Sequence, residues 1–208
     1  MAVYDLEEQE KIDALKDWWK RWGTTVMAAL AAFVVAYVGF SQWRSYQTKR
    51  SQEAAVLYEA LKQQKSASAL SANAKAIMEQ HGKTAYAPRA ALSAAKASFE
   101  AGDLDAARTF LEWVIAHAKE KELQEIARLR LATVLLDENK LDAALQVLQG
   151  NHEQSFQAAA LSLKADILAA QGKISEARAV YREALDKADP ATDRQPIEIK
   201  LEMLGEGK

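Results

Sequence analysis

The sequence predicts an all-α protein in which a single transmembrane helix precedes an α-solenoid of degenerate helix pairs. Three observations lead to this fold class. Glycine and proline, the residues that most disfavour helices, number only 8 and 3 among 208 residues. One uncharged run fills the chain between Arg21 and Arg44. A pattern of small and large apolar residues recurs three times in the second half of the chain.

Composition excludes several classes of site. The chain contains no cysteine, so it can have no disulfide, thiol nucleophile, cysteine-based zinc site or cysteine-linked lipid anchor. The formal net charge of −2 gives no overall basic surface of the kind that binds polyanions. We therefore expect no nucleic acid among the partners.

The uncharged run between Arg21 and Arg44 is long enough to cross a bilayer. Its 22 residues would form a helix of about 33 Å at 1.5 Å per residue, and the hydrocarbon core of a bilayer is about 30 Å thick. The sequence therefore predicts a transmembrane helix over residues 22–43, with the lipid bilayer as a partner. Aromatic rings that favour the headgroup region flank the run, namely Trp18, Trp19, Trp22, Trp43 and Tyr46.

Two other interpretations of this run are a cleaved signal peptide and a buried helix of a soluble protein. A signal peptide begins with a short basic segment, whereas a long segment rich in acidic residues precedes this run. A buried helix of a soluble protein is rarely uncharged over such a length. Lys and Arg are equally frequent on the two flanks, so the positive-inside rule leaves the orientation open.

These patterns divide the chain into four parts. A short head covers residues 1–21, the transmembrane helix 22–43 and a juxtamembrane helix 44–65. A repeat domain with a C-terminal capping helix covers residues 66–208. A short head and a long tail suit an uncleaved signal anchor whose head stays in the cytoplasm.

Three segments of the second half share one pattern, over residues 100–111, 137–148 and 170–181. Each contains a turn residue that can adopt the left-handed conformation that ends a helix. The turn residues are Gly102, Asn139 and Gly172. Alanine stands seven residues before each turn and five after it, and a large residue follows four positions later. These packing positions are Ala95, Ala107, Leu111, Ala132, Ala144, Leu148, Ala165, Ala177 and Tyr181.

This pattern resembles the tetratricopeptide repeat, whose unit of about 34 residues is a pair of antiparallel helices. Two helices can cross closely only where their side chains are small, and the large residue fills the gap to the next pair. A single pair cannot cover its own apolar face, so several pairs must stack. Several positions of the first helices depart from the repeat pattern, so we expect degenerate pairs. Near the end, Ile197, Leu201 and Leu204 share one helical stripe that suits a capping helix.

No catalytic, cofactor-binding or metal-binding residue is expected. The histidines His81, His117 and His152 are far apart in the sequence, and the chain has no glycine-rich phosphate loop and no G-x-S-x-G nucleophile motif. A solenoid instead offers a face for peptides or partner proteins. Basic residues on the first helices that could line such a face are Arg89, Lys96, Arg128, Arg130 and Lys164. The ordinary interpretation of these charges is a solvated surface.

The layout of the whole chain is similar to the YfgM-type ancillary subunit of the bacterial Sec translocon. The resemblance rests on "YDLEEQEKIDALKDWWKRWG", the alanine-rich span, "WRSYQTKRSQEAAVLYEAL", the degenerate repeats and the terminal "QPIEIKLEMLG". It implies a single-pass protein of the cell inner membrane with a cytoplasmic N-terminus and a periplasmic repeat domain. Partners implied by the family are the translocon channel subunits, a membrane-anchored prolyl-isomerase-like periplasmic chaperone, unfolded exported chains and a cytoplasmic stress-response regulator.

The function expected from the residues and the resemblance together is a membrane-anchored interaction protein, and no enzyme. It would help to pass exported proteins from the translocon to periplasmic chaperones. Tethering would raise the local concentration of the repeat domain near the channel to about the millimolar range, so that weak contacts suffice. The alternative is a repeat scaffold for another complex of the cell envelope, which the same architecture would serve.

Overall fold

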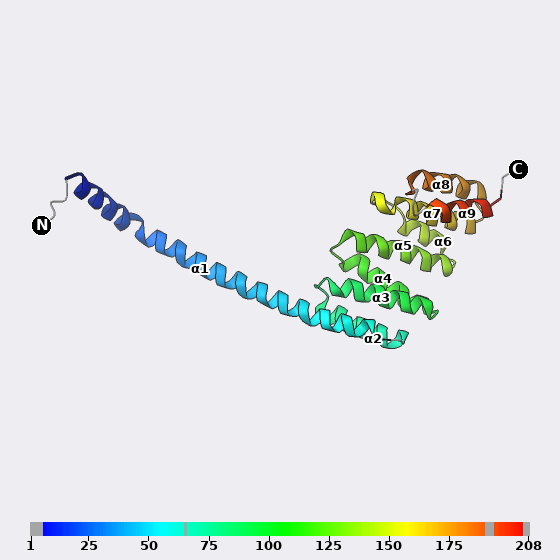
Figure 1. Cartoon of the computed structure of the whole chain (residues 1–208), viewed down its shortest axis with the longest axis horizontal. Helices are drawn as coiled ribbons and strands as arrows, with labels where there is room; N and C mark the ends of the chain where they lie inside the picture. The colour runs from blue at the N-terminus through cyan, green and yellow to red at the C-terminus, as the bar shows by residue number, and fades with distance from the viewer. Residues whose placement is uncertain (1–5, 65, 190–193, 206–208) are drawn as a thin grey trace. The chain divides into compact units, whose positions relative to one another are not determined.

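The computed structural model describes residues 6–64, 66–189 and 194–205 (Figure 1). Within these ranges the regular structure consists of helices and contains no strand, which confirms the all-α prediction. The helices are α1 (Leu6–Lys62), α2 (Ala67–His81), α3 (Tyr86–Glu100), α4 (Leu104–His117), α5 (Lys121–Asp137), α6 (Leu141–Val147), α7 (Gln154–Ala170), α8 (Ile174–Lys187) and α9 (Arg194–Met203).

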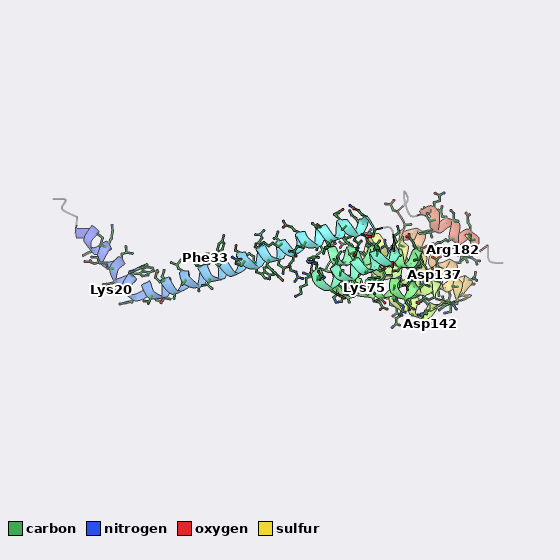
Figure 2. The ribbon with its side chains drawn as sticks, turned by 90° about the horizontal axis from the view of Figure 1, so that it is seen from below. Lys20, Phe33, Lys75, Asp137, Asp142 and Arg182 are labelled. Atoms are coloured by element: carbon green, nitrogen blue, oxygen red, sulfur yellow. The ribbon has the colours of Figure 1, made fainter. Side chains whose placement is uncertain are left out.

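The chain divides into two compact units, residues 1–50 and 51–208. The first unit contains most of α1, including the apolar run. Phe33 is 69% exposed and Val35 is 72% exposed, so nothing within this unit covers the apolar side chains. Figure 2 shows Lys20 and Phe33 projecting from the helix. Among the described residues, α1 is the one helix long and apolar enough to cross a membrane.

No break in α1 marks the predicted limits of the head, the transmembrane helix and the juxtamembrane helix. The helix continues from Leu6 to Lys62, because charged residues such as Arg21 and Arg44 end an apolar run without ending a helix. The limits of the four parts therefore stay predictions. Residues 1–5 of the head lie outside the described residues, as do 190–193 and 206–208 of the repeat domain.

The second unit contains three helix pairs, α3–α4, α5–α6 and α7–α8, that close with the same turn. The turn residue is left-handed in each pair, with φ of 80° at Gly102, 59° at Asn139 and 78° at Gly172, which confirms the sequence prediction. In the first pair the Asp103 N–H donates to the Ser98 carbonyl (2.9 Å), the bond that defines a Schellman motif. Equivalent bonds of 2.8 and 2.9 Å close the other two pairs.

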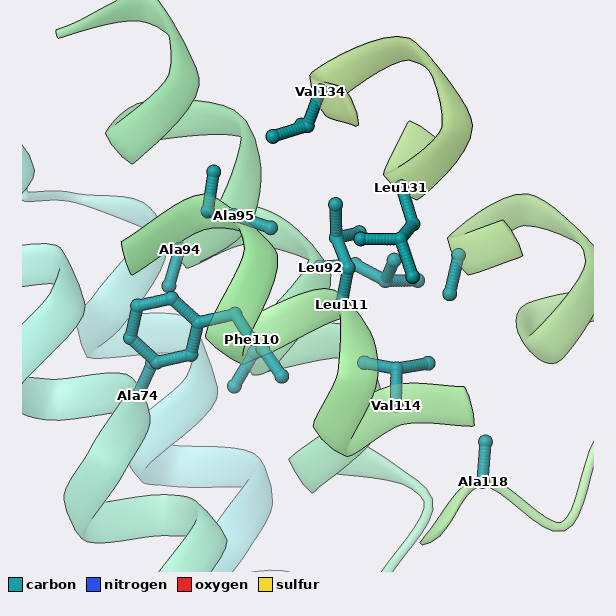
Figure 3. Packing of buried hydrophobic residues seen from close by; sticks show 14 of the residues in the cluster. Ala74, Leu92, Ala94, Ala95, Phe110, Leu111, Val114, Ala118, Leu131 and Val134 are labelled. Carbon is teal, nitrogen blue, oxygen red and sulfur yellow. The ribbon is translucent and has the colours of Figure 1, made fainter. Parts of the chain in front are cut away.

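Small residues lie where the helices of the array cross. The side chains at the nine predicted packing positions are all buried: Ala107, Ala132, Ala144, Ala165 and Ala177 at 0% exposed, Leu111 at 1%, Ala95 at 2%, Tyr181 at 3% and Leu148 at 8%. Figure 3 shows residues of α2, α3 and α4, including Ala74, Ala94 and Phe110, turned toward one core. Phe110 is 1% exposed, because the alanines of neighbouring helices leave room for its ring.

The hydrophobic core of the second unit consists of two clusters. The larger cluster extends from Leu61, in the last turns of α1, through α2 to α6 and includes Ile167 of α7. The smaller cluster joins α7, α8 and α9 through Ala165, Tyr181 and Ile197. Helix α9 packs on α8, and Ile197 is 5% exposed, so α9 covers the apolar end of the last pair.

The second helix of the middle pair is short. Helices α4 and α8 have 14 residues each, whereas α6 has 7. Gly150 follows with φ of 118°, a conformation that favours glycine. The chain therefore leaves the helical path soon after Leu148 and reaches α7 through an irregular loop.

Candidate functional site

A groove made of two adjoining hollows follows one side of α5. The first hollow, of about 310 Å³, lies between α3, α4 and α5, and the second, of about 440 Å³, lies between α5, α7 and α9. Thr133 lines both, so the hollows adjoin at this residue. We call them together the α5 groove, and its residues used below are Lys96, Phe99, Glu100, Arg130, Thr133, Val134, Leu136, Leu163, Asp166 and Lys200.

Apolar side chains form the walls of the α5 groove. Helix α5 packs on both α3 and α7, and this brings large residues of three first helices together: Phe99, Val134, Leu136 and Leu163. The Thr133 hydroxyl donates to the Leu129 carbonyl (3.1 Å), so this hydroxyl needs no other partner. The groove therefore suits apolar side chains, because their transfer out of water is favourable.

Charged groups stand at the edges of the α5 groove. In the first hollow, Lys96 lies 3.7 Å from Glu100 in an exposed ion pair, and exposed Arg130 makes no ion pair within the described residues. In the second hollow, Lys200 pairs with Asp166 at 2.6 Å. Of the predicted basic face, Lys96 and Arg130 are the two members that line the groove.

The other members of the predicted basic face lie elsewhere. Arg89 forms a two-point ion pair with Glu120, with nitrogen–oxygen distances of 3.1 and 2.6 Å. Arg128 donates to Glu125 (2.7 Å), and Lys164 is exposed outside both hollows. The structure therefore does not bring the five basic residues together on one surface. A role of Arg89, Arg128 or Lys164 in binding stays a prediction.

Sequence reasoning missed the apolar lining of the α5 groove. Phe99, Leu136 and Leu163 are partly buried residues of the first helices, and in the sequence they look like ordinary core residues. One signal could have indicated them. They are large apolar residues in addition to those that the repeat pattern needs to pack each helix pair. Their partial exposure depends on how α3, α5 and α7 pack side by side, which the sequence does not show.

A hydrogen-bond network holds α9 at the second hollow. The Tyr181 hydroxyl donates to the Asp166 carboxylate, and Lys200 of α9 donates to the same carboxylate (2.6 Å). Burial raises the pKa of Tyr181 above its usual value, and the hydrogen bond to Asp166 raises this pKa further. Tyr181 therefore keeps its proton well into the alkaline range, and the pair of Asp166 and Lys200 fixes one wall of the groove.

The described residues hold no group of three or more His, Asp or Glu side chains placed to bind a metal ion. His152 contacts Glu125 (Nδ1 to Oε2, 2.7 Å) and the Leu148 carbonyl (Nε2 to O, 3.0 Å), which ties the loop after α6 to α5. His117 stacks on Trp113. The geometry of these histidines is that of structural contacts.

Comparisons with known proteins agree with this architecture. A family model described as tetratricopeptide repeat-like domain matches residues 16–206. A curated protein of Neisseria gonorrhoeae named ancillary SecYEG translocon subunit is 32% identical, over 98% of this chain and all of its own length. The chain belongs to the family of ancillary SecYEG translocon subunits.

Other members of this family that match carry the same name. The Haemophilus influenzae protein is 31% identical over 97% of this chain and all of its own length. The Escherichia coli protein is 25% identical over 91% of each chain. No solved structure matches this chain at a significant level. The family match confirms the predicted repeat fold and the resemblance seen in the sequence.

Proposed function

We propose that this protein is a membrane-anchored ancillary subunit of the SecYEG translocon, whose helical array binds polypeptide in the α5 groove. The observation that carries the proposal is the match to relatives of that name over nearly the whole chain, the apolar part of α1 included. The exposed apolar side chains of α1 support the anchor, since such a surface needs a lipid or protein cover. Its orientation would place the head in the cytoplasm and the array in the periplasm, at the inner membrane.

The α5 groove supports the polypeptide-binding part of the proposal. A chain that has just left a channel is unfolded and still exposes large apolar side chains. The two hollows, of about 310 and 440 Å³, would each take such side chains, and Arg130 would favour an acidic group beside the first hollow. Binding would be weak, because the segment loses conformational freedom when it is held.

Tethering makes weak binding sufficient. A domain anchored beside its partner experiences an effective concentration of about the millimolar range for short linkers. The array would hold an emerging chain briefly and release it to a periplasmic chaperone, such as a membrane-anchored prolyl-isomerase-like protein. Fast release suits this role better than tight binding, since a handover requires dissociation.

Site-specific photo-crosslinking in native membranes tests the groove. A photoreactive residue at position 133 should crosslink to exported chains during translocation and to translocon or chaperone subunits. The matched control is the same residue at position 164, which is exposed on α7 and lies outside both hollows. Equal products from both positions, or no translocation-dependent product from position 133, would contradict the proposed function.

A further inference from the structure

The middle helix pair lacks half of its second helix. The three second helices align at Leu111, Leu148 and Tyr181, and the next six residues are "EWVIAH" in α4, "QGNHEQ" after α6 and "REALDK" in α8. Helices α4 and α8 continue through these residues, whereas α6 ends at Val147. Gly150, with φ of 118°, lies outside the helical conformation. About two helical turns are therefore missing from the row of second helices.

The loop that replaces these turns is held in place. The His152 ring lies 2.7 Å from the Glu125 carboxylate and 3.0 Å from the Leu148 carbonyl. His152 is partly buried and Glu125 is 5% exposed. The shortening of α6 is thus part of the folded structure.

A shallow, open hollow of about 280 Å³ lies at the end of the shortened helix, between α4, α5 and α6. We call it the α6 socket, and its lining residues are Glu112, Ile115, Ala116, Arg128, Leu131 and Val147. It is separate from the α5 groove. Leu131 lines the socket and Thr133 the groove, and residues two apart on a helix point about 200° apart.

The core of the array also divides at this place. The larger hydrophobic cluster ends with Ala144 and Leu148 of α6, and from α7 it includes buried Ile167 and partly buried Leu163. The smaller cluster belongs to α7, α8 and α9 alone. A helix seated in the α6 socket would extend the row of second helices and bury apolar surface at this weak junction.

We propose that the α6 socket binds an amphipathic helix of a partner protein, about two turns long, in the place of the missing part of α6. A helix fits because its backbone N–H and C=O groups are paired internally and need nothing from the apolar walls. The second helices α4 and α8 of the other pairs are likewise amphipathic. The partner would place large apolar side chains, three or four residues apart, against Ile115, Leu131 and Val147.

Charge defines the partner helix further. Glu112 is exposed at the rim of the α6 socket and makes no ion pair within the described residues. Arg128 is already paired with Glu125 (2.7 Å). Glu112 interacts electrostatically with Arg108 of the preceding turn, and Arg108 also pairs with Asp105 and Glu138. Negative charge is therefore in excess beside the socket, and the partner helix would carry a basic residue against Glu112.

A labelled peptide with the sequence of α8, residues 174–187, tests the proposal as a mimic of the partner helix. It combines apolar residues at helical spacing with basic residues in its last turns. Fluorescence anisotropy would measure its binding to the full-length protein in detergent. We expect saturable binding, with a scrambled peptide of the same composition as the baseline.

Two socket variants and one matched control complete the test. Ile115→Glu places a charge in the apolar wall and should weaken peptide binding about tenfold or more. Glu112→Lys changes only an exposed residue, so it folds, and should weaken binding about threefold at low salt. Ile199→Glu, at a 50% exposed isoleucine of α9, should leave binding unchanged. No binding above baseline, or equal binding by wild type and both socket variants, would overturn the proposal.

A photoreactive residue at position 147 in native membranes identifies the source of the helix. Crosslinks that map to an amphipathic helix of another protein, and that Ile115→Glu removes, support the proposal. Crosslinks that map to a second copy of this chain overturn it. Because the α5 groove is untouched by these variants, the crosslinks from position 133 separate this result from the proposed function.

Discussion

A buried carboxylate links the two parts of the middle helix pair. Glu125 is 5% exposed and accepts hydrogen bonds from Arg128 and His152, each at 2.7 Å. A buried charge is stable only when it is paired. Glu125 therefore explains how a seven-residue α6 and the irregular loop behind it keep one conformation.

Replacing Glu125 by alanine should destabilise the array. Arg128 and His152 would lose their acceptor while partly buried, and we expect a loss of about 2 kcal/mol in the free energy of unfolding. Denaturant unfolding of the full-length protein in detergent, followed by circular dichroism, measures this loss. Glu122→Ala, at an exposed residue of the same helix, should change stability by less than about 0.5 kcal/mol. An equal effect of both substitutions would contradict the role of Glu125.

Tyr181 should make the array less stable in strongly alkaline solution. Burial, and then the hydrogen bond to Asp166, raise the pKa of Tyr181 in the folded protein, whereas a tyrosine in an unfolded chain loses its proton at about pH 10. Above that pH the unfolded state binds fewer protons than the folded state, so stability falls as pH rises. The stabilisation is fully present below about pH 10.

The variant Tyr181→Phe isolates this contribution. Its free energy of unfolding should fall less steeply between about pH 10 and 11.5 than that of wild type, by up to about 1.4 kcal/mol per pH unit. Unfolding curves of both proteins across this range provide the measurement. Lysines titrate in the same range in both proteins, so their effect cancels in the difference. Parallel pH profiles would show that Tyr181 ionises equally in both states.

At the scale of elements, the turns of the helix pairs were predictable and the lengths of the helices were not. Gly102, Asn139 and Gly172 indicate their left-handed turns because few residues tolerate that conformation. The early end of α6 escaped prediction, because the compared segments stop at Leu148, although Gly150 two residues later is a breaker signal. The continuity of α1 was not predicted either, because a change from apolar to polar residues does not end a helix.

The α5 groove was beyond prediction for a different reason. Its walls come from three helices separated by tens of residues, and the sequence alone does not say which faces of α3, α5 and α7 meet. The basic residues were visible as charges, but ion pairs with Glu120 and Glu125 involve Arg89 and Arg128. The pair of Arg89 and Glu120 joins segments 31 residues apart and depends on the packed structure, whereas that of Arg128 and Glu125 lies three residues apart on α5 and was open to prediction.

The turn residues provide a test at the scale of elements. Gly172→Ala should destabilise the array by about 1 kcal/mol, because a Cβ atom makes the left-handed conformation unfavourable. Asn139→Gly removes such a Cβ from the same position of the middle pair and should be neutral or slightly stabilising, since glycine also gains freedom in the unfolded chain. Thermal unfolding of both variants gives the comparison. A loss of stability in Asn139→Gly as large as that in Gly172→Ala would contradict the shared turn geometry.

At the scale of the molecule, the two core clusters predict that the array opens from its C-terminal end. The smaller cluster contains few buried side chains besides Ala165, Tyr181 and Ile197. Hydrogen exchange of the full-length protein should therefore be faster in α7, α8 and α9 than in α3, α4 and α5. Ile197→Ala should cost about 2 kcal/mol or more and speed exchange in α7 to α9 only. Ile199→Ala, at an exposed residue, is the control, and uniform exchange across the array would contradict two separate clusters.

The membrane anchor gives the last test at this scale. The protein should stay in the membrane pellet after carbonate extraction, and protease added to spheroplasts should digest the array. Arg at positions 34 and 38 should reduce retention, because each costs about 3 kcal/mol near the centre of a transmembrane helix. Val56→Arg, at a 70% exposed residue beyond the span, should not. A wild-type protein released by carbonate would contradict the anchor.

The last turns of α1 also matter for the preparation of the array without the apolar part of this helix. Leu61 is 0% exposed within the larger core cluster, yet it belongs to the helix that begins in the head. A recombinant fragment that starts at residue 63 would lack this side chain, and losing a buried leucine costs about 2–5 kcal/mol. Likewise, a protease that cuts just after Leu61 would release an array that lacks this buried side chain, so such a cut would both separate the array from the apolar part of α1 and destabilise it.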